Sequence, residues 1–297
     1  MQRITRGKTR GYMRGRGRAI LDVMRVVALL VVVFASSLAR ADLKADVEKL
    51  VRANIKAVAA DKFDAFDRTL TGGRVLVLPD GKSTIDKGLV ADIYGPKAKR
   101  VTHEIESLHI IADAAKKLAW FHGSIAATFV VDKKRVQLPM RISGIAADEG
   151  APVGWKIQAL MYARTMPDKE LATHAADATR ARAKTSGDAT LAKLVAAWFD
   201  GGSIASDRSK NVAVVVNGTS SVEIGDGAFA VKLVKAWEAL KPWATSVEAT
   251  VFAGGEIAFV RAELMVPVDK QAAKIVLGAI LARENTAWRW VSLNLTP

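Results

Sequence analysis

Cysteine is absent from this sequence of 297 residues. Without it the chain can form no disulfide, no thiolate nucleophile, no cysteine-based zinc site and no iron–sulfur cluster. Histidine is scarce, with four residues, and neither HExxH, GxSxG nor a phosphate-binding glycine loop occurs. The sequence therefore predicts no metal site and no cofactor, and apolar cores alone must hold the fold together.

The sequence also lacks an apolar run that matches the roughly 20 residues needed to cross a membrane. The stretch VVALLVVVFASSL, residues 26–38, follows a basic segment and precedes small residues. This order is typical of a secretory signal peptide, so residues 1–41 are expected to be cleaved off between Ala41 and Asp42. An uncleaved anchor is the alternative, and Met24 is an alternative start. The expected location is periplasmic or secreted.

Acidic residues are fewer than basic ones, 30 Asp and Glu against 44 Lys and Arg, so the formal net charge is +14 at pH 7. Residues 1–41 hold nine Lys or Arg against one Asp, a net of +8, which leaves +6 for the remaining chain. An excess of that size, spread along the chain, is ordinary surface charge rather than a nucleic-acid footprint. A basic arm that binds nucleic acid is the competing interpretation of RGKTRGYMRGRGR, but it fits poorly with export. No nucleic-acid partner is expected. Contact with a membrane is expected only through the signal segment, if it stays uncleaved.

An internal repeat with a period near 138 residues organises the rest of the chain. Three segments recur in order: RVLVLPDG (74–81) as NVAVVVNG (211–218), AWFHGSIAATFV from Ala119 as AFVRAELMVPV from Ala258, and GWKIQAL from Gly154 as AWRWVSL from Ala287. Such self-similarity indicates a duplicated domain, whereas chance likeness among short apolar strands is the alternative. We predict one domain over residues 42–165, a solvated helical linker over 166–188 and a second domain over 189–297.

Each copy has a readable order of elements. Apolar residues at helical spacing predict two helices between Leu43 and Leu70, with a break near Asp61. The dipeptides Asp80-Gly81 and Asn217-Gly218 predict turns. Further predictions are a strand at 75–78, short helices at 89–94 and 229–240, and period-two strands at 102–111, 118–131, 136–146 and 155–163.

This order resembles the NTF2-like superfamily, and its SnoaL-like branch in particular. The likeness lies in VLVLPDGKSTIDKGLVADIY and VAVVVNGTSSVEIGDGAFAVKLVKAW, with Trp155 and Trp288 adding to it. The resemblance implies an α+β fold with two tandem cone-shaped barrels, in which helices pack on a curved antiparallel sheet and the mouth often holds a small apolar ligand. Because isomerases, dehydratases, dimerisation modules and transport factors share it, the fold says little about activity.

Candidate ligand-binding residues of the first cone are Asp64 and Asp67 on its second helix, and Tyr94 and Tyr162 at its mouth. A proton-abstracting enzyme would need a carboxylate or histidine there, with its pKa adjusted by apolar surroundings. Helix carboxylates are more often solvated or serve as caps, which is the competing interpretation of the two aspartates. No residue is assigned a catalytic role.

Strand parity places other candidates outside the cone. From Leu118 onward the apolar face must meet the helices, so His122 and Trp120 point outward. His122 is then a solvated or interface residue, while His103 and His109, six apart, could share a face. Trp120 and its counterpart Phe259 are large, apolar and directed outward, which predicts that the two copies pack sheet against sheet as an intramolecular pseudo-dimer.

Two functions remain open at this point. One is a non-enzymatic envelope or periplasmic protein that binds a small apolar ligand or another protein. The other is an isomerase- or hydratase-type enzyme with an acid–base residue in the first cone. A cavity of several hundred Å³ that contains a carboxylate or histidine would favour the enzyme, and a cone plugged by side chains would favour the binding protein.

Overall fold

The computed structural model describes residues 43–113, 115–164, 173, 175–204, 207, 209, 214–217, 220–221 and 227–296. The expected signal segment over residues 1–41 lies outside these residues, as does His174 of the expected linker. No described helix is long and apolar enough to span a membrane.

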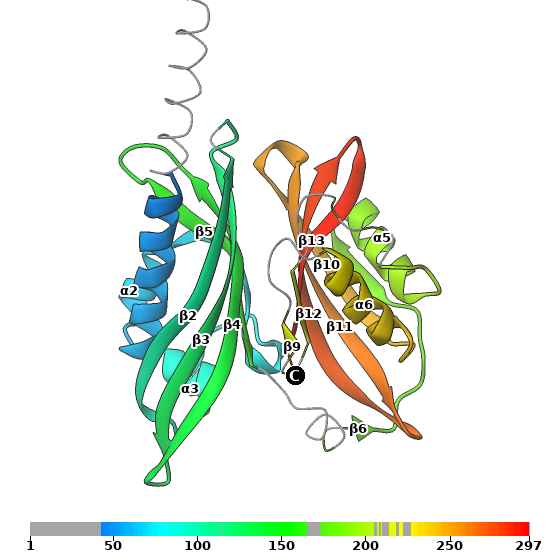
Figure 1. The fold of residues 1–297 in the computed structure, drawn as a ribbon, viewed down its shortest axis with the longest axis horizontal. Helices are drawn as coiled ribbons and strands as arrows, with labels where there is room; N and C mark the ends of the chain where they lie inside the picture. Colours follow the sequence, from blue (N-terminus) through cyan, green and yellow to red (C-terminus); the bar gives the residue numbers. More distant parts are fainter. Residues whose placement is uncertain are drawn as a thin grey trace, which may run out of the picture.

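The first domain packs three helices on one face of a five-stranded sheet (Figure 1). Its helices are residues 43–59, α2 (Phe63–Asp67) and α3 (Leu89–Tyr94), and a 3-10 turn η1 covers Pro79–Gly81. Its strands are β1 (Leu70–Val77), β2 (Lys99–Asp113), β3 (Leu118–Val131), β4 (Lys134–Asp148) and β5 (Trp155–Arg164). They lie in the order β1-β5-β4-β3-β2, with β1 parallel to β5 and every other pair antiparallel.

The second domain repeats this plan around helices α5 (Ala189–Phe199) and α6 (Gly227–Glu238). Its long strands are β10 (Trp243–Phe252), β11 (Ile257–Val268), β12 (Gln271–Glu284) and β13 (Ala287–Thr296). Its short elements are β6 (Ala175–Ala176), β7 (Lys184–Gly187), β8 (Val214–Asn217), β9 (Ser220–Ser221) and the 3-10 turn η3 (Ala253–Gly255). The main strand order is β7-β10-β11-β12-β13-β8-β9.

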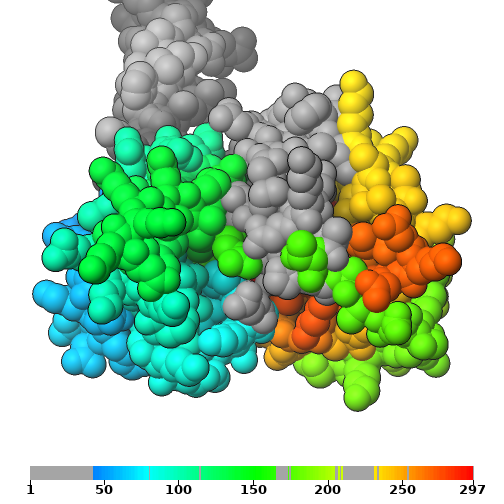
Figure 2. Space-filling model, turned by 90° about the horizontal axis from the view of Figure 1, so that it is seen from below, coloured from blue at the N-terminus to red at the C-terminus, as the bar shows by residue number. Residues whose placement is uncertain are grey.

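The two sheets share one topology. The run β8-β13-β12-β11-β10 matches β1-β5-β4-β3-β2, and β8 is parallel to β13 as β1 is to β5. The predicted fold class, α+β with helices packed on curved antiparallel sheets, is confirmed. In each domain the helices cover the sheet face that points away from the other domain, so the opposite faces of the two sheets, called the outer faces because they lie outside each cone, point toward each other (Figure 1). Seen from below, the first domain (blue to green) and the second (light green to red) form two lobes (Figure 2).

Alternating residues of β3 build the first core. Phe121, Ile125 and Ala127 are fully buried against helix residues such as Val51 and Ile55. Each large apolar side chain buried in this way contributes about 1.5–3 kcal/mol relative to an exposed one. The parity predicted for this strand, with Ala119 and Phe121 toward the helices, is therefore confirmed.

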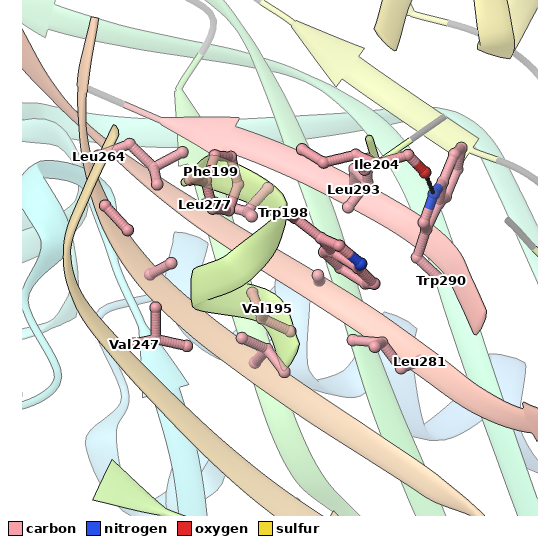
Figure 3. Packing of buried hydrophobic residues seen from close by; sticks show 14 of the residues in the cluster. Val195, Trp198, Phe199, Ile204, Val247, Leu264, Leu277, Leu281, Trp290 and Leu293 are labelled. Carbon is pink, nitrogen blue, oxygen red and sulfur yellow. Dashed lines mark hydrogen bonds between the residues drawn. The ribbon is translucent and has the colours of Figure 1, made fainter. Parts of the chain in front are cut away.

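The second core forms beneath α5 (Figure 3). Val195, Trp198 and Phe199 of this helix pack on the sheet near Leu277 and Leu293. Trp290 Nε1 donates a hydrogen bond to the Ile204 carbonyl at 2.6 Å, which satisfies the polar atom of a fully buried ring.

The prediction of a helical linker is wrong over residues 175–187, although most of these residues are solvent-exposed as expected. The segment forms no helix: β6 covers Ala175–Ala176, residues 177–183 have no regular structure, and β7 pairs in parallel with β10 at the edge of the second sheet. An unpaired edge strand exposes a row of backbone donors and acceptors, so a polar segment passing nearby can gain hydrogen bonds as a strand. Leu70 is likewise the first residue of β1 instead of the end of a helix.

The predicted helix break near Asp61 and the predicted turn at Asp80-Gly81 are confirmed. The helix over residues 43–59 ends in a turn at Asp61, whose φ is 51°. Gly81 ends η1 with a φ of 73°, and a Cβ there would lie 2.7 Å from Val276 Cγ2 of the second domain. Both the left-handed backbone and the close approach therefore require glycine at this position. Gly218, its expected counterpart, lies outside the described residues.

Candidate functional site

A chain of hydrogen bonds between buried side chains crosses the interior of the first cone. The Tyr162 hydroxyl of β5 donates to Asn54 Oδ1 at 2.8 Å, and Asn54 Nδ2 donates to Thr69 Oγ1 at 2.7 Å. Thr69 Oγ1 in turn donates to the Phe66 carbonyl at 2.6 Å. Burial raises the pKa of Tyr162 well above its ordinary value, with a smaller contribution from Tyr94. This phenol therefore stays neutral and holds the helices to the sheet, instead of lying at the mouth of the cone as predicted.

Tyr94 and His103 form a second polar pair, between α3 and β2. His103 Nδ1 lies 3.0 Å from the Ile55 carbonyl, which can only accept, so Nδ1 carries the proton. Nε2 then accepts the hydroxyl proton of Tyr94. Burial lowers the pKa of His103, against a raising effect of its bond to Ile55, and burial raises the pKa of Tyr94. Both rings are neutral near pH 7 and bonded to each other.

The predicted aspartates do not reach the cone. Asp64 is exposed, and Asp67 is 45% exposed and pairs with Arg74 across 2.7 Å. On the short helix α2, Phe66 is the buried residue, so Asp64, two positions before it, and Asp67, one position after it, lie on other sides of the helix. The predicted position of Asp64 and Asp67 inside the cone is therefore wrong, and the alternative interpretation as solvated helix carboxylates fits their exposure.

His103 and His109 do not share a face. A β-bulge between Ile105 and Ser107 shifts the register of β2, so His103 pairs with Ala127 and His109 with His122. One extra residue reverses the parity of a strand, and a bulge cannot be read from alternation alone. His103 therefore faces the helices, whereas His109 lies on the outer face.

His122 is buried on that outer face, with 4% of its surface exposed, so the solvated alternative is wrong. Burial, and secondarily the positive fields of Arg141 and His109, lower the pKa of His122 to about 3. Its Nδ1 is buried without a hydrogen-bond partner among the described residues. The ring is thus a neutral, packed side chain at physiological pH.

The structure places Trp120 and Phe259 in one buried cluster between the two sheets, 7% and 1% exposed. The cluster contains, from the first sheet, Val77, Leu118, Trp120, Ile145, Ala159, Met161 and Ala163, and from the second, Ile257, Phe259, Val276, Ile280 and Val291. A Cβ at Gly278 would overlap Met161 Sδ, so the sheets approach closely there.

Polar contacts also cross between the domains. Arg261 donates to the Gly81 carbonyl at 2.8 Å and pairs with Glu263 at 2.9 Å. Lys116 forms an ion pair with Glu256, and Asn294 Nδ2 donates to Ser143 Oγ. Together with the apolar cluster, these contacts bury the outer faces of both sheets against each other.

An open cavity lies on the flank of the second domain. It has a volume of about 680 Å³ and is walled by the segment 180–185, by α5 and by the start of β10. Its apolar surface comes from Phe199, Trp243 and several alanines, and its charged groups are Arg180, Arg182, Lys193 and Asp200. Sequence reasoning missed this site because the segment 180–185 looked like a solvated linker.

Metal binding finds no support in the part of the chain that the structure describes, since no group of three or more His, Asp or Glu residues there could hold an ion. Asp92, which is buried beside α3, is engaged in the fold. It accepts from the backbone N–H groups of Asp86 and Lys87, each at 2.8 Å, and from Lys82 at 3.0 Å.

Neither a family model nor a curated protein matches this sequence. Several solved structures are similar to part of it. An NTF2-like superfamily protein from Salmonella enterica is 13% identical and covers 43% of this chain and 94% of its own, with a TM-score of 0.36. A hexachlorocyclohexane dehydrochlorinase from Novosphingobium barchaimii is 12% identical and covers 43% of this chain and 90% of its own, with a TM-score of 0.37. The CaMKII hub of S. rosetta is 17% identical and covers 40% of this chain and 95% of its own, with a TM-score of 0.34. Identities of this size concern the fold alone and assign no role to any residue.

Proposed function

We propose that this chain is an exported, non-enzymatic binding protein, in which the first domain is a packed structural unit and the second carries a ligand site. The observation that carries this proposal is the contrast between the two domains. The first cone is filled by side chains, whereas the second domain has an open cavity on its flank.

The packing of the first cone argues against catalysis there. Phe121, Met140 and Ile142 are fully buried at the positions where a substrate would have to lie. A Cβ at Gly144 would overlap the Phe121 ring, so little room remains around it. Substrate entry would require these side chains to leave a close-packed core, which costs several kcal/mol.

The cavity of the second domain has the properties of a ligand site. Its volume of about 680 Å³ lies within the range of roughly 300–1,000 Å³ that is typical of small-molecule pockets. Polar and apolar groups share its lining, with the polar share the larger, so its walls suit a ligand that combines an apolar body with polar groups. A small ligand with apolar character is the preferred occupant, and a protein partner is the alternative.

Export remains part of the proposal, resting on the sequence of residues 1–41. Fractionation of cells that produce the full chain, with mass spectrometry of the N-terminus, tests it. A mature protein that begins at Asp42 outside the inner membrane supports export, and an intact N-terminus inside the cell contradicts it.

The enzyme hypothesis keeps one specific observation in its favour, the Tyr94–His103 pair. A neutral histidine with a fixed tautomer and a half-buried phenol could exchange a proton with a substrate that reached it. His103→Gln keeps polar atoms in this region but removes the base. If the chain converted any substrate and His103→Gln abolished the conversion, the non-enzymatic proposal would be wrong.

Native mass spectrometry of the purified protein tests binding directly. We expect a retained small molecule of a few hundred daltons, or a thermal shift with a ligand, without chemical conversion. Ala181→Trp, at an exposed position in the cavity wall, should block the site and abolish both signals. A ligand that binds equally well to this variant would place the site elsewhere and refute the assignment.

A further inference from the structure

The charges around the cavity of the second domain are not balanced. Asp200 pairs with Arg180 at 3.5 Å, and the same guanidinium donates to the Phe199 carbonyl at 3.0 Å. These two charges neutralise each other. Arg182 and Lys193 line the same cavity, are exposed and have no ion-pair or hydrogen-bond partner among the described residues. Two positive charges therefore remain at the rim.

The unpaired charged groups of this cavity are donors. Arg182 contributes a guanidinium and Lys193 an ammonium, and neither group can accept a hydrogen bond. The indole Nε1 of Trp243, another wall residue, is buried without an acceptor in the described part of the chain. Among the described residues that line the cavity, Asp200 alone carries a carboxylate, and it is already paired. A ligand that supplies several acceptor lone pairs and negative charge would complement this set.

The remaining wall is apolar. Ala183 and Ala196 are partly buried against the core of the second domain, and the rings of Phe199 and Trp243 lie beside them. Phe199 itself belongs to that core and meets the Trp237 ring edge-on, with ring centroids 5.5 Å apart. The aromatic wall is therefore held in place and can bury the body of a ligand whose charged group stays at the rim.

We propose that this cavity binds a small amphipathic anion, with a carboxylate or sulfonate at Arg182 and Lys193 and an aromatic or aliphatic body against Phe199 and Trp243. The inference rests on the proposed ligand-binding function and specifies its chemistry. An apolar ligand without charge would leave both cations unused and would gain nothing from them.

Two dyes with the same aromatic body separate these cases. Anilinonaphthalene sulfonate carries a negative charge, and phenylnaphthylamine is its uncharged parent. Both fluoresce more strongly in an apolar site, so titration of the full chain gives their dissociation constants. We expect the sulfonate to bind about tenfold more tightly than the uncharged dye, in keeping with two surface ion pairs.

Charge-removal variants assign the preference to the site. Arg182→Gln with Lys193→Gln should weaken binding of the sulfonate about tenfold and leave the uncharged dye unaffected. The matched control is Lys232→Gln with Lys235→Gln, which removes the same charge from exposed positions of α6 outside the cavity wall. This control should change neither dissociation constant. Circular dichroism verifies that both double variants remain folded.

The outcomes distinguish this inference from the function on which it rests. If both dyes bind the wild-type chain equally and Ala181→Trp blocks both, the cavity is a ligand site without charge preference, and only the anion inference fails. If Ala181→Trp leaves both dyes bound, the cavity is not the site and the proposed function fails as well. If both double variants weaken binding of the sulfonate equally, the preference for the sulfonate reflects the net charge of the protein, and the inference is overturned. The ratio of the two dissociation constants in the wild-type protein tests the charge preference without any variant.

Discussion

Truncation of Trp120 tests the packing of the two sheets against each other. The ring is 7% exposed and lies in the cluster that joins β3 and β5 of the first sheet to β11, β12 and β13 of the second. Trp120→Ala removes a large buried side chain and leaves a cavity between two sheets that cannot fully collapse. Such substitutions cost about 3–5 kcal/mol of unfolding free energy.

A double-mutant cycle with Phe259→Ala makes the test specific for the junction. If both rings share one buried cluster, the first truncation already loosens the surroundings of the second, so the two losses should not add. We expect an interaction energy of about 0.5–3 kcal/mol, whereas independent sites would add to within about 0.3–0.5 kcal/mol. Phe63→Ala is the control, because Phe63 is 44% exposed and its truncation should cost about 0.5 kcal/mol or less.

Urea denaturation followed by far-ultraviolet circular dichroism measures all four proteins of the cycle without depending on tryptophan fluorescence. For a chain of this size, a loss of 3–5 kcal/mol lowers the melting temperature by roughly 6–20 °C. A Trp120→Ala protein within about 1 kcal/mol of the wild type, together with an additive cycle, would refute the face-to-face arrangement of the sheets.

Three further outcomes follow from individual contacts. Tyr162→Phe leaves the buried Asn54 carbonyl oxygen without its donor and should cost about 1–3 kcal/mol in urea denaturation, and an unchanged midpoint would contradict the closed network. Burial holds the pKa of His122 at about 3 against 6.5 when unfolded, so the unfolded chain takes up the proton first and stability should fall as the pH drops from 6.5 toward 3. His122→Asn should flatten that slope by up to about 1.4 kcal/mol per pH unit between roughly pH 6 and 4, and an identical pH profile would exclude His122 as its source. Arg261→Met removes the donor to the Gly81 carbonyl across the domains and should cost about 1–3 kcal/mol, while a loss below about 0.5 kcal/mol would show that this contact is dispensable.

Much of the fold was predictable because it depends on local pattern. The alternation along β3 gave the face of that strand that meets the helices, and the matching order of apolar segments in the two halves gave their shared order of strands. The bounds of β3 and α3 agree with the prediction to the residue. Errors arose where one residue changed the outcome, as at the bulge in β2 that separates His103 from His109.

The candidate sites were less predictable. Tyr94 and Tyr162 were identified as candidates, but their partners His103 and Asn54 come from other elements, and only the packing brings them together. The segment 180–185 (RARAKT) contains no large apolar residue, so nothing in the sequence marked it as a cavity wall.

The sequence by itself excluded the chemistry that cysteine would have supplied, and it determined the α+β class and the residues of β3 that turn inward, since composition and local periodicity are properties of the chain alone. The tertiary structure decided which polar groups are satisfied, which outward rings are covered and where a cavity stays open. Those outcomes depend on contacts between residues far apart in the chain, and Tyr162 with Asn54, or Arg261 with Gly81, become neighbours only when the sheets and helices pack.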